Sequence, residues 1–249
     1  MASNSNGKAI LVSDFGRSGQ GWLSYMLCYI LNAKFIEPYN LLQGREYSSS
    51  EDIIRNTKGN LPGREKTQYD FVVKTHNLSG GEINLTDKVI FLTRDPRDVA
   101  VSAFYWHKNG AKNAKWKNAK GKIFWTIATK IKIIDYILTA VGWARHYSSW
   151  KKVSSFRVRY EDLSSDTKKT LLSILNYIDV SADEKIIEEA IEKFSFEKIT
   201  GRKKGEERSQ NSEFRKGIVG DYKSHFSLLE LKIFWLICGK SASEAGYKF

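Results

Sequence analysis

The stretch that decides the fold is "SDFGRSGQGWLSYML" (Ser13 to Leu27), which follows the apolar run "AILV" at residues 9–12 and leads into a helical pattern. Its three glycines, Gly16, Gly19 and Gly21, let the backbone turn tightly and bring amide groups close to a ligand. A turn of this kind at the N-terminus of a helix favours an anion. We expect a phosphate-like group here, with a plain strand-to-helix turn as the alternative.

The turn matches only half of the nucleoside-triphosphate motif, GxxxxGK followed by Ser or Thr. Gly16 and Gly21 have the required spacing, but Trp22 and Leu23 stand where the lysine and the hydroxyl residue belong. The lysine for the β- and γ-phosphates and the hydroxyl for Mg²⁺ are therefore missing from this loop. If phosphate binds here, we expect other cations to hold it, without a metal.

The chain is strongly basic. Its 249 residues include 40 Lys and Arg against 28 Asp and Glu, which gives a formal net charge of +12. This charge predicts anionic partners, from nucleotides and polyanions to membrane surfaces, without choosing among them. Because 41% of the residues are hydrophobic, the chain can bury a core, and we expect one α/β domain over residues 1–249.

Cysteine content and hydropathy exclude other classes of protein. Cys28 and Cys238 lie in apolar sequence without metal-ligand spacing, so we expect small buried side chains, and two cysteines cannot form a disulfide framework. The N-terminal "MASNSNGKAI" lacks the apolar core of a signal peptide, and no uncharged apolar run of about 18 residues or more occurs. We expect a soluble, cytoplasmic protein without a transmembrane segment.

Strand patterns alternate with helical patterns along the chain. The strand patterns lie at residues 8–14, 70–76, 88–95 and 156–162. The helical patterns lie at residues 21–33, 96–107 and 166–178. The first and third strand patterns are near-continuous apolar runs, typical of strands buried on both faces of a parallel sheet. We expect an α/β fold whose ligands bind beyond the carboxyl ends of the strands, where the glycine turn, "KTH", "TRDPRD" and "RYED" would meet.

Lys74 and His76 are candidates for chemistry. They lie two residues apart near the end of a strand pattern, so their side chains point to the same side. An imidazole beside an ammonium can remove a proton and stabilise negative charge in one reaction. A structural histidine at a strand end is the alternative.

The segment "TRDPRDVAVSAFYW", residues 93–106, offers groups that bind phosphate. Arg94 and Arg97 carry planar forks suited to phosphate oxygens, and Ser102 adds a hydroxyl donor. The alternative is that the arginines pair with Asp95 and Asp98.

A second basic segment, "FRKGIVGDYKSHF", covers residues 214–226. Arg215 and Lys216 stand beside a glycine, a combination that forms an anion-binding nest. A solvated turn is the alternative for this segment taken alone.

Together these segments resemble the nucleotide-dependent cytosolic sulfotransferases, which move a sulfuryl group from 3′-phosphoadenosine 5′-phosphosulfate (PAPS) to an acceptor hydroxyl or amine. "FGRSGQGWL" is similar to their 5′-phosphosulfate loop, and "VKTH" to the strand that bears the catalytic base. "TRDPRDVAVSAFYW" is similar to their 3′-phosphate strand and helix, and "RKGIVGDYKSHF" to their C-terminal nucleotide-closing loop. The resemblance, from about residue 8 to 226, implies a three-layer α/β/α fold around a central parallel sheet, like that of the P-loop NTPases.

The resemblance also implies the site residues. His76 would be the general base that deprotonates the acceptor, and Lys74 and Arg17 would stabilise charge on the sulfuryl and leaving oxygens. The nucleotide would be held by Arg17, Ser18, Gly19, Gln20, Gly21, Trp22, Arg94, Ser102, Tyr160, Phe196, Arg215, Lys216 and Gly217. The implied co-substrate is PAPS and its product is 3′-phosphoadenosine 5′-phosphate (PAP), with no metal and no nucleic acid as partner.

The sequence departs from the family pattern at several positions. Arg17 replaces the usual lysine of the first loop, and Gln20 and Gly21 replace paired threonines. Arginine can stabilise a leaving oxygen but cannot act as an acid. The family's dimer motif is degraded to "KSHFSLLELK", with Lys232 in place of the acidic residue, so the sequence does not predict dimerisation by that route.

The acceptor is not identified by any motif. The family binds it under variable loops, here Gln43–Gln68, Lys108–Lys132 and Gly201–Arg208. The second of these loops holds eight lysines and no acidic residue, which suggests an acidic acceptor or docking to a membrane surface, with a solvated lid as the alternative. Two other functions stay open on the residues alone: a metal-dependent P-loop kinase, and a non-catalytic binder of polyanions or nucleic acid.

Overall fold

The structure is a computed structural model that describes residues 8–36, 67–113, 131–207 and 214–249. Within these ranges, five parallel strands form one sheet in the order β2-β3-β1-β4-β5. The strands are β1 (Ala9–Asp14), β2 (Lys34–Ile36), β3 (Phe71–Thr75), β4 (Lys88–Thr93) and β5 (Phe156–Arg159). The α-helices are α1 (Gln20–Leu31), α4 (Pro96–Asn113), α6 (Lys132–Trp150), α7 (Tyr160–Ser165), α8 (Thr167–Tyr177), α9 (Glu184–Lys193), α10 (Phe196–Thr200) and α11 (Leu228–Glu244). Two 3₁₀ helices are η1 (Gly81–Leu85) and η2 (Asp221–Ser224).

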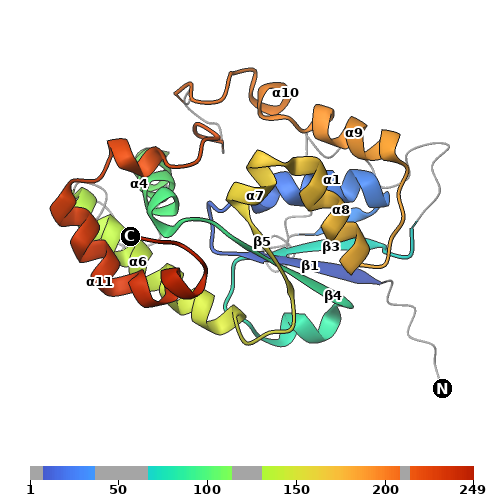
Figure 1. The fold of residues 1–249 in the computed structure, drawn as a ribbon, viewed down its shortest axis with the longest axis horizontal. Helices are drawn as coiled ribbons and strands as arrows, with labels where there is room; N and C mark the ends of the chain where they lie inside the picture. The colour runs from blue at the N-terminus through green and yellow to red at the C-terminus, as the bar shows by residue number, and fades with distance from the viewer. Residues whose placement is uncertain (1–7, 37–66, 114–130, 208–213) are drawn as a thin grey trace.

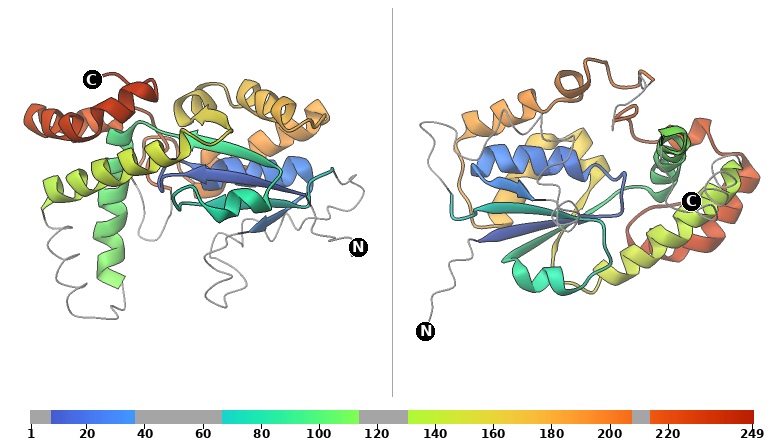
Figure 2. Two further views of the ribbon diagram at one scale, coloured as in Figure 1. Left: turned by 90° about the horizontal axis from the view of Figure 1, so that it is seen from below. Right: turned by 180° about the vertical axis from the view of Figure 1, so that it is seen from behind.

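The helices cover both faces of the sheet, because successive strand residues point to opposite faces. Ile10 and Val12 of β1 pack in a cluster with residues of α1, α7, α8 and α9. Leu11 of β1 packs in a separate cluster that includes Trp143 and Trp150 of α6. Figures 1 and 2 show the first set of helices on one side of the sheet and α6 and α11 side by side on the other. The expected three-layer α/β/α fold is confirmed.

The four strand patterns are confirmed with shifted boundaries, the largest shift being at the end of the last one. All six residues of β1 are buried, and so are five of the six residues of β4, as their near-continuous apolar runs predict. The strand pattern at 156–162 ends earlier, because β5 ends at Arg159 and Tyr160 begins α7. Glu161 and Asp162 lie in the first turn of that helix, where acidic side chains interact favourably with the helix dipole.

Both cysteines are buried and free, as expected from their apolar surroundings. Burial raises the pKa of each thiol, that of Cys238 to about 12. Within the described ranges, no helix combines the length and the apolarity needed to cross a membrane.

The register of the sheet aligns the carboxyl ends of its strands. Ser13 of β1 lies opposite Thr75 of β3, and Asp14 lies opposite Leu92 of β4. The loops that follow β1, β3 and β4 therefore leave the sheet at one edge. The N-terminus of α1 and the N-terminus of α4 lie at this edge, which is where open parallel sheets bind their ligands.

Candidate active site

A cavity of about 410 Å³ opens at the carboxyl ends of the strands. Its lining comes from the glycine turn, the end of β3, the middle of α4, the helices α6, α7 and α10, and the loop before η2. Of the residues that the sequence nominated, Ser18 and Arg97 do not line it. The others do, namely Arg17, Gly19, Gln20, Gly21, Trp22, Lys74, His76, Arg94, Ser102, Tyr160, Phe196, Arg215, Lys216 and Gly217. Segments separated by more than 100 residues therefore meet in one place, as the alternating pattern predicted.

The glycine turn has the backbone that its sequence requires. Gly19 has φ +98°, and a Cβ atom there would lie 2.6 Å from the ring of Tyr160, so only glycine fits. Ser18 is fully buried, and its hydroxyl donates to the carbonyl of Phe15 at 2.5 Å. The side-chain amide of Gln20 donates to the carbonyls of Val12 and Thr75. These two side chains therefore hold the turn onto the sheet.

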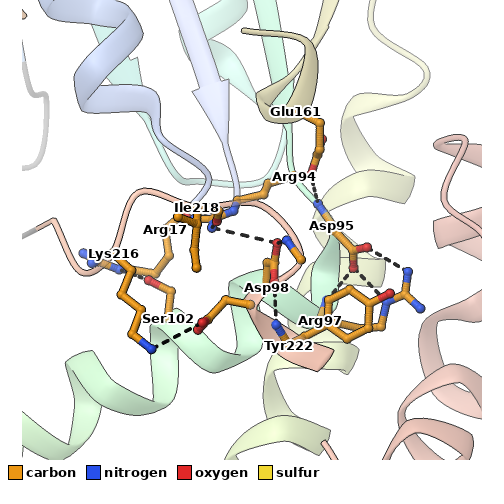
Figure 3. A network of polar contacts seen from close by, with 12 residues as sticks. Arg17, Arg94, Asp95, Arg97, Asp98, Ser102, Glu161, Lys216, Ile218 and Tyr222 are labelled. Carbon is orange, nitrogen blue, oxygen red and sulfur yellow. Dashed lines mark hydrogen bonds and ion pairs between the residues drawn. The ribbon is translucent and has the colours of Figure 1, made fainter. Parts of the chain in front are cut away.

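Arg94 and Arg97 have different surroundings (Figure 3). Arg97 donates to both carboxylate oxygens of Asp95, at 3.0 and 2.7 Å, and does not line the cavity. Arg94 lines the cavity, and its guanidinium lies 4.3 Å from the centre of the Tyr160 ring. It donates to the carbonyls of Arg17 and Ile218, at 3.2 and 2.9 Å. Both arginines thus pair with a neighbouring aspartate: Arg97 closely with Asp95, and Arg94 more loosely with Asp98, with 4.0 Å between Nη2 and Oδ2. Arg94 in addition ties the glycine turn to the C-terminal loop.

Arg17 reaches across the cavity to α4. Its Nε donates to Oγ of Ser102 at 3.3 Å, so the two nominated residues contact each other (Figure 3). Arg17 has φ +76°, in the left-handed region that non-glycine residues rarely adopt. Such a conformation persists only where the surroundings enforce it, and it is typical of ligand-binding turns.

Asp98 fastens the C-terminal loop to α4. Its carboxylate accepts from the backbone N–H of Gly220 at 2.7 Å and of Tyr222 at 2.9 Å. Burial raises the pKa of Asp98, while Arg94 and these two amides oppose that rise. The loop so fastened carries Arg215, Lys216 and Gly217 to the cavity.

The cations of this loop face a buried carboxylate. Arg215 forms an ion pair with Asp221, and Nζ of Lys216 lies 3.4 Å from the same carboxylate. Burial acts to raise the pKa of Asp221, but Arg215 and Lys216 outweigh it and the pKa is lowered. Nε and Nη1 of Arg215 and Nε of Arg94 are buried without hydrogen-bond partners in the part of the chain described. Unpaired charged donors are costly, so the cavity fits an anion.

Aromatic rings line one side of the cavity. The indole N–H of Trp22 donates to the carbonyl of Phe194 at 2.8 Å, and its ring meets Tyr160 edge-on. Phe196 packs against Gly217, whose φ is +66° and where a Cβ atom would lie 2.5 Å from the phenyl ring. Flat rings beside cationic side chains form a suitable surface for a nucleobase.

Lys74 and His76 both line the cavity, as their spacing predicted. Nδ1 of His76 lies 2.5 Å from Oδ1 of Asp14, the last residue of β1. Sequence reasoning did not nominate Asp14, because its partner is 62 residues away and no local pattern joins them. Within the described ranges, no three His, Cys, Asp or Glu side chains are grouped as metal ligands would be.

The acceptor loops fall largely outside the described residues. Of the three expected loops, residues 43–66, 114–130 and 208 are not described. Trp106 and His107 of α4 and Thr139 of α6, which flank the second of these loops in the chain, are described and line the cavity. Nδ1 of His107 lies 2.7 Å from Oδ1 of Asp135, which is buried.

A parallel α/β sheet with an anion-binding cavity at its strand ends is typical of nucleotide-binding proteins. Residues 8–246 match the family model described as the sulfotransferase domain, and the chain belongs to this family. The resemblance drawn from the sequence motifs is thereby confirmed.

Known proteins similar to this chain carry the same family name. Sulfotransferase 1 family member D1 of Rattus norvegicus is 25% identical over 260 residues, which cover 96% of this chain and 85% of that protein. Sulfotransferase 1E1 of Homo sapiens is 22% identical over 253 residues, covering 88% of this chain and 78% of that protein.

Two solved structures confirm the fold. Mouse sulfotransferase SULT7A1 complexed with PAP has a TM-score of 0.64 at 19% identity, covering 97% of this chain and 86% of that chain. Retinol dehydratase in complex with androsterone and inactive cofactor PAP has a TM-score of 0.59 at 19% identity, covering 97% of this chain and 82% of that chain.

Proposed function

We propose that this protein transfers the sulfuryl group of PAPS to a hydroxyl or amine of an acceptor and releases PAP. The observation that carries the proposal is the single cavity in which Lys74 and His76 meet the cationic residues of three other segments. Family membership supports the reaction class, and two similar solved structures are described as complexes with PAP.

The nucleotide would be held at two charged ends. The 5′-phosphosulfate lies on the glycine turn, where Arg17 and the backbone amides of residues 18–22 face it. The 3′-phosphate lies between Arg94 and Ser102 of one segment and Arg215, Lys216 and Gly217 of another. The adenine packs among Trp22, Tyr160 and Phe196. On binding, the 3′-phosphate replaces part of the contact between Asp221 and its two cations.

The chemistry follows from the positions of Lys74 and His76. His76 takes the proton of the acceptor, the acceptor oxygen or nitrogen forms a bond to sulfur, and the bond between sulfur and the bridging oxygen breaks. The electron pair of that bond leaves with PAP, a stable phosphate, so a strong general acid is not needed. Lys74 and Arg17 stabilise the charge that develops on the sulfuryl and bridging oxygens.

Calorimetric titration tests the nucleotide site. We expect PAP to bind tightly in EDTA, and ATP with Mg²⁺ to bind more weakly or not at all. Preference for ATP with Mg²⁺ would support a kinase instead. If neither nucleotide binds while RNA or DNA binds with a steep salt dependence, the protein is a polyanion binder.

A variant at His76 tests catalysis. His76→Ala should fold, bind PAP as the wild type does, and lose transfer by about 100-fold or more, the usual contribution of a general base. Transfer is followed with ³⁵S-labelled PAPS against a panel of phenols, alcohols and amines. Loss of PAP binding in the variant would mean that His76 has a structural role.

A further inference from the structure

Asp14 and His76 meet because of the register of two neighbouring parallel strands. Val12 lies opposite Lys74 and Ser13 lies opposite Thr75, so the next residues along both strands are Asp14 and His76. Their side chains are in contact, with 2.5 Å between Oδ1 of Asp14 and Nδ1 of His76. The same ring nitrogen lies 3.3 Å from the backbone carbonyl of Asp14. Both oxygens therefore face Nδ1 and leave Nε2 on the other side of the ring.

The two partners differ sharply in exposure. The Asp14 side chain is 1% exposed, whereas the His76 side chain is 47% exposed and lines the cavity. Among the described residues, His76 is the one side chain in polar contact with the Asp14 carboxylate. Burying a carboxylate is costly unless a donor faces it. Neither carboxylate oxygen has a hydrogen-bond partner among the described residues, and Nδ1 of His76, 2.5 Å from Oδ1, is the group placed to compensate the buried charge. The hydrogen bond of Nδ1 goes to the backbone carbonyl of Asp14, which helps to orient the ring.

A second histidine lies close to the pair without competing for it. His146 of α6 is buried, and its Nε2 has no hydrogen-bond partner in the described part of the chain. Burial lowers the pKa of His146 to about 4, although the charge of Asp14 opposes this. His146 is therefore uncharged near neutral pH. The cation that can form beside Asp14 during turnover is the one on His76.

The contact decides which ring nitrogen carries the proton. A carboxylate and a carbonyl accept hydrogen bonds and cannot donate them, so the Nδ1 that faces them bears the hydrogen of the neutral ring. Nε2 then has the free lone pair that a general base needs. When Nε2 takes the proton of the acceptor, the ring becomes an imidazolium, and the buried carboxylate 2.5 Å away stabilises the new charge.

We propose that Asp14 is a positioning residue that holds His76 in the tautomer able to deprotonate the acceptor. This inference rests on the proposed function, because it assigns Asp14 a role only if His76 is the base. Asp14 itself contacts no reacting atom in this scheme. Asp14 acts by orienting the His76 ring and by placing a negative charge next to Nδ1 of that ring.

Nitrogen NMR of the full chain tests the tautomer directly. The protein contains four histidines, so ¹⁵N-histidine labelling gives four ring systems, and comparison with His76→Ala assigns the one of interest. At a pH where the ring is neutral, we expect the proton of wild-type His76 on Nδ1. A proton on Nε2 in the wild-type protein would overturn the inference, and this result needs no variant that folds.

Kinetics of Asp14→Asn test the consequence. Transfer from ³⁵S-labelled PAPS to 4-nitrophenol, used as the probe acceptor, should fall in kcat by about 100-fold or more, while the Kd for PAP is unchanged. The double variant with His76→Ala should be no slower than His76→Ala alone, because residues that act as a unit are not additive. Unchanged kcat in Asp14→Asn would also overturn the inference.

A matched control comes from another buried Asp that contacts Nδ1 of a histidine at the cavity. Asp135 is 1% exposed and contacts Nδ1 of His107 at 2.7 Å. Asp135→Asn should leave kcat and PAP affinity near the wild-type values, so a loss confined to Asp14→Asn is specific to the base. If His76→Ala retains full transfer, the proposed function fails. If His76→Ala is inactive and Asp14→Asn is fully active, only the inference about Asp14 fails.

Discussion

Gly217→Ala should weaken nucleotide binding through a contact visible in the structure. A Cβ atom at this position would lie 2.5, 2.7 and 3.1 Å from three atoms of the Phe196 ring. Carbon atoms pack best at about 3.5–4.0 Å, so the ring or the loop must move by about 1 Å. Phe196 is only 8% exposed, which leaves little room for that movement. The left-handed backbone, φ +66°, adds about 1–2 kcal/mol for a residue with a Cβ atom.

The displaced ring is the one that we place against the adenine. Stacking of one base on an aromatic ring contributes about 1–3 kcal/mol. Losing the lower half of that range raises the Kd for PAP by about tenfold, since 1.4 kcal/mol is a factor of ten. Calorimetry with PAP measures the change, and thermal unfolding records the cost of backbone strain.

Gly201→Ala is the matched control. Gly201 has φ +67°, nearly the same as Gly217, but no atom lies within 4 Å of a Cβ atom built there. Both variants therefore carry the same backbone strain, and only Gly217→Ala adds the overlap with Phe196. Wild-type PAP affinity in Gly217→Ala, or an equal loss in Gly201→Ala, would refute the reasoning.

Two further predictions concern buried charged groups. In Asp98→Asn, the side-chain oxygen can accept from only one of the two backbone amides, those of Gly220 and Tyr222, and the NH₂ group faces the second amide. PAP should therefore bind about tenfold or more weakly by calorimetry. An unchanged Kd would mean that the loop is held without Asp98. For His146, burial lowers the pKa to about 4. Because the unfolded chain then binds more protons between about pH 4 and 6.5, the free energy of unfolding should fall by about 3 kcal/mol as the pH drops through this window. His146→Phe should lose that slope in urea unfolding at a series of pH values, and an equal slope in both proteins would contradict the assignment.

The layers and the main strands could be predicted from the sequence because each depends on a local pattern of apolar and polar residues. The apolar runs of β1 and β4 are buried on both sides, as such runs predict. The strand β2 was not predicted, since it has only three residues, none of them fully buried, and begins three residues after the end of α1. Such a short edge strand has no period long enough to detect.

The site was predictable to the level of segments and not to the level of every side chain. Gln20 was expected to surround the phosphosulfate, yet its amide group donates to two strand carbonyls, so its nucleotide contact would come from the backbone. Arg94 and Arg97 have the same sequence context, and only packing distinguishes the one beside the cavity from the one paired with Asp95. Asp14 was not predicted, because its contact with His76 depends on the register between β1 and β3, which no local sequence pattern reveals.

The hydrogen bonds between Asp98 and the C-terminal loop affect when the binding site is completed during synthesis. They join Asp98 to amides 122 and 124 residues later, and the cations Arg215 and Lys216 belong to the same late segment. A growing chain that has made the sheet up to β4 already carries the glycine turn and Arg94, but none of the closing loop. A nucleotide can therefore contact both sets of cations only after the last part of the chain has docked onto the first.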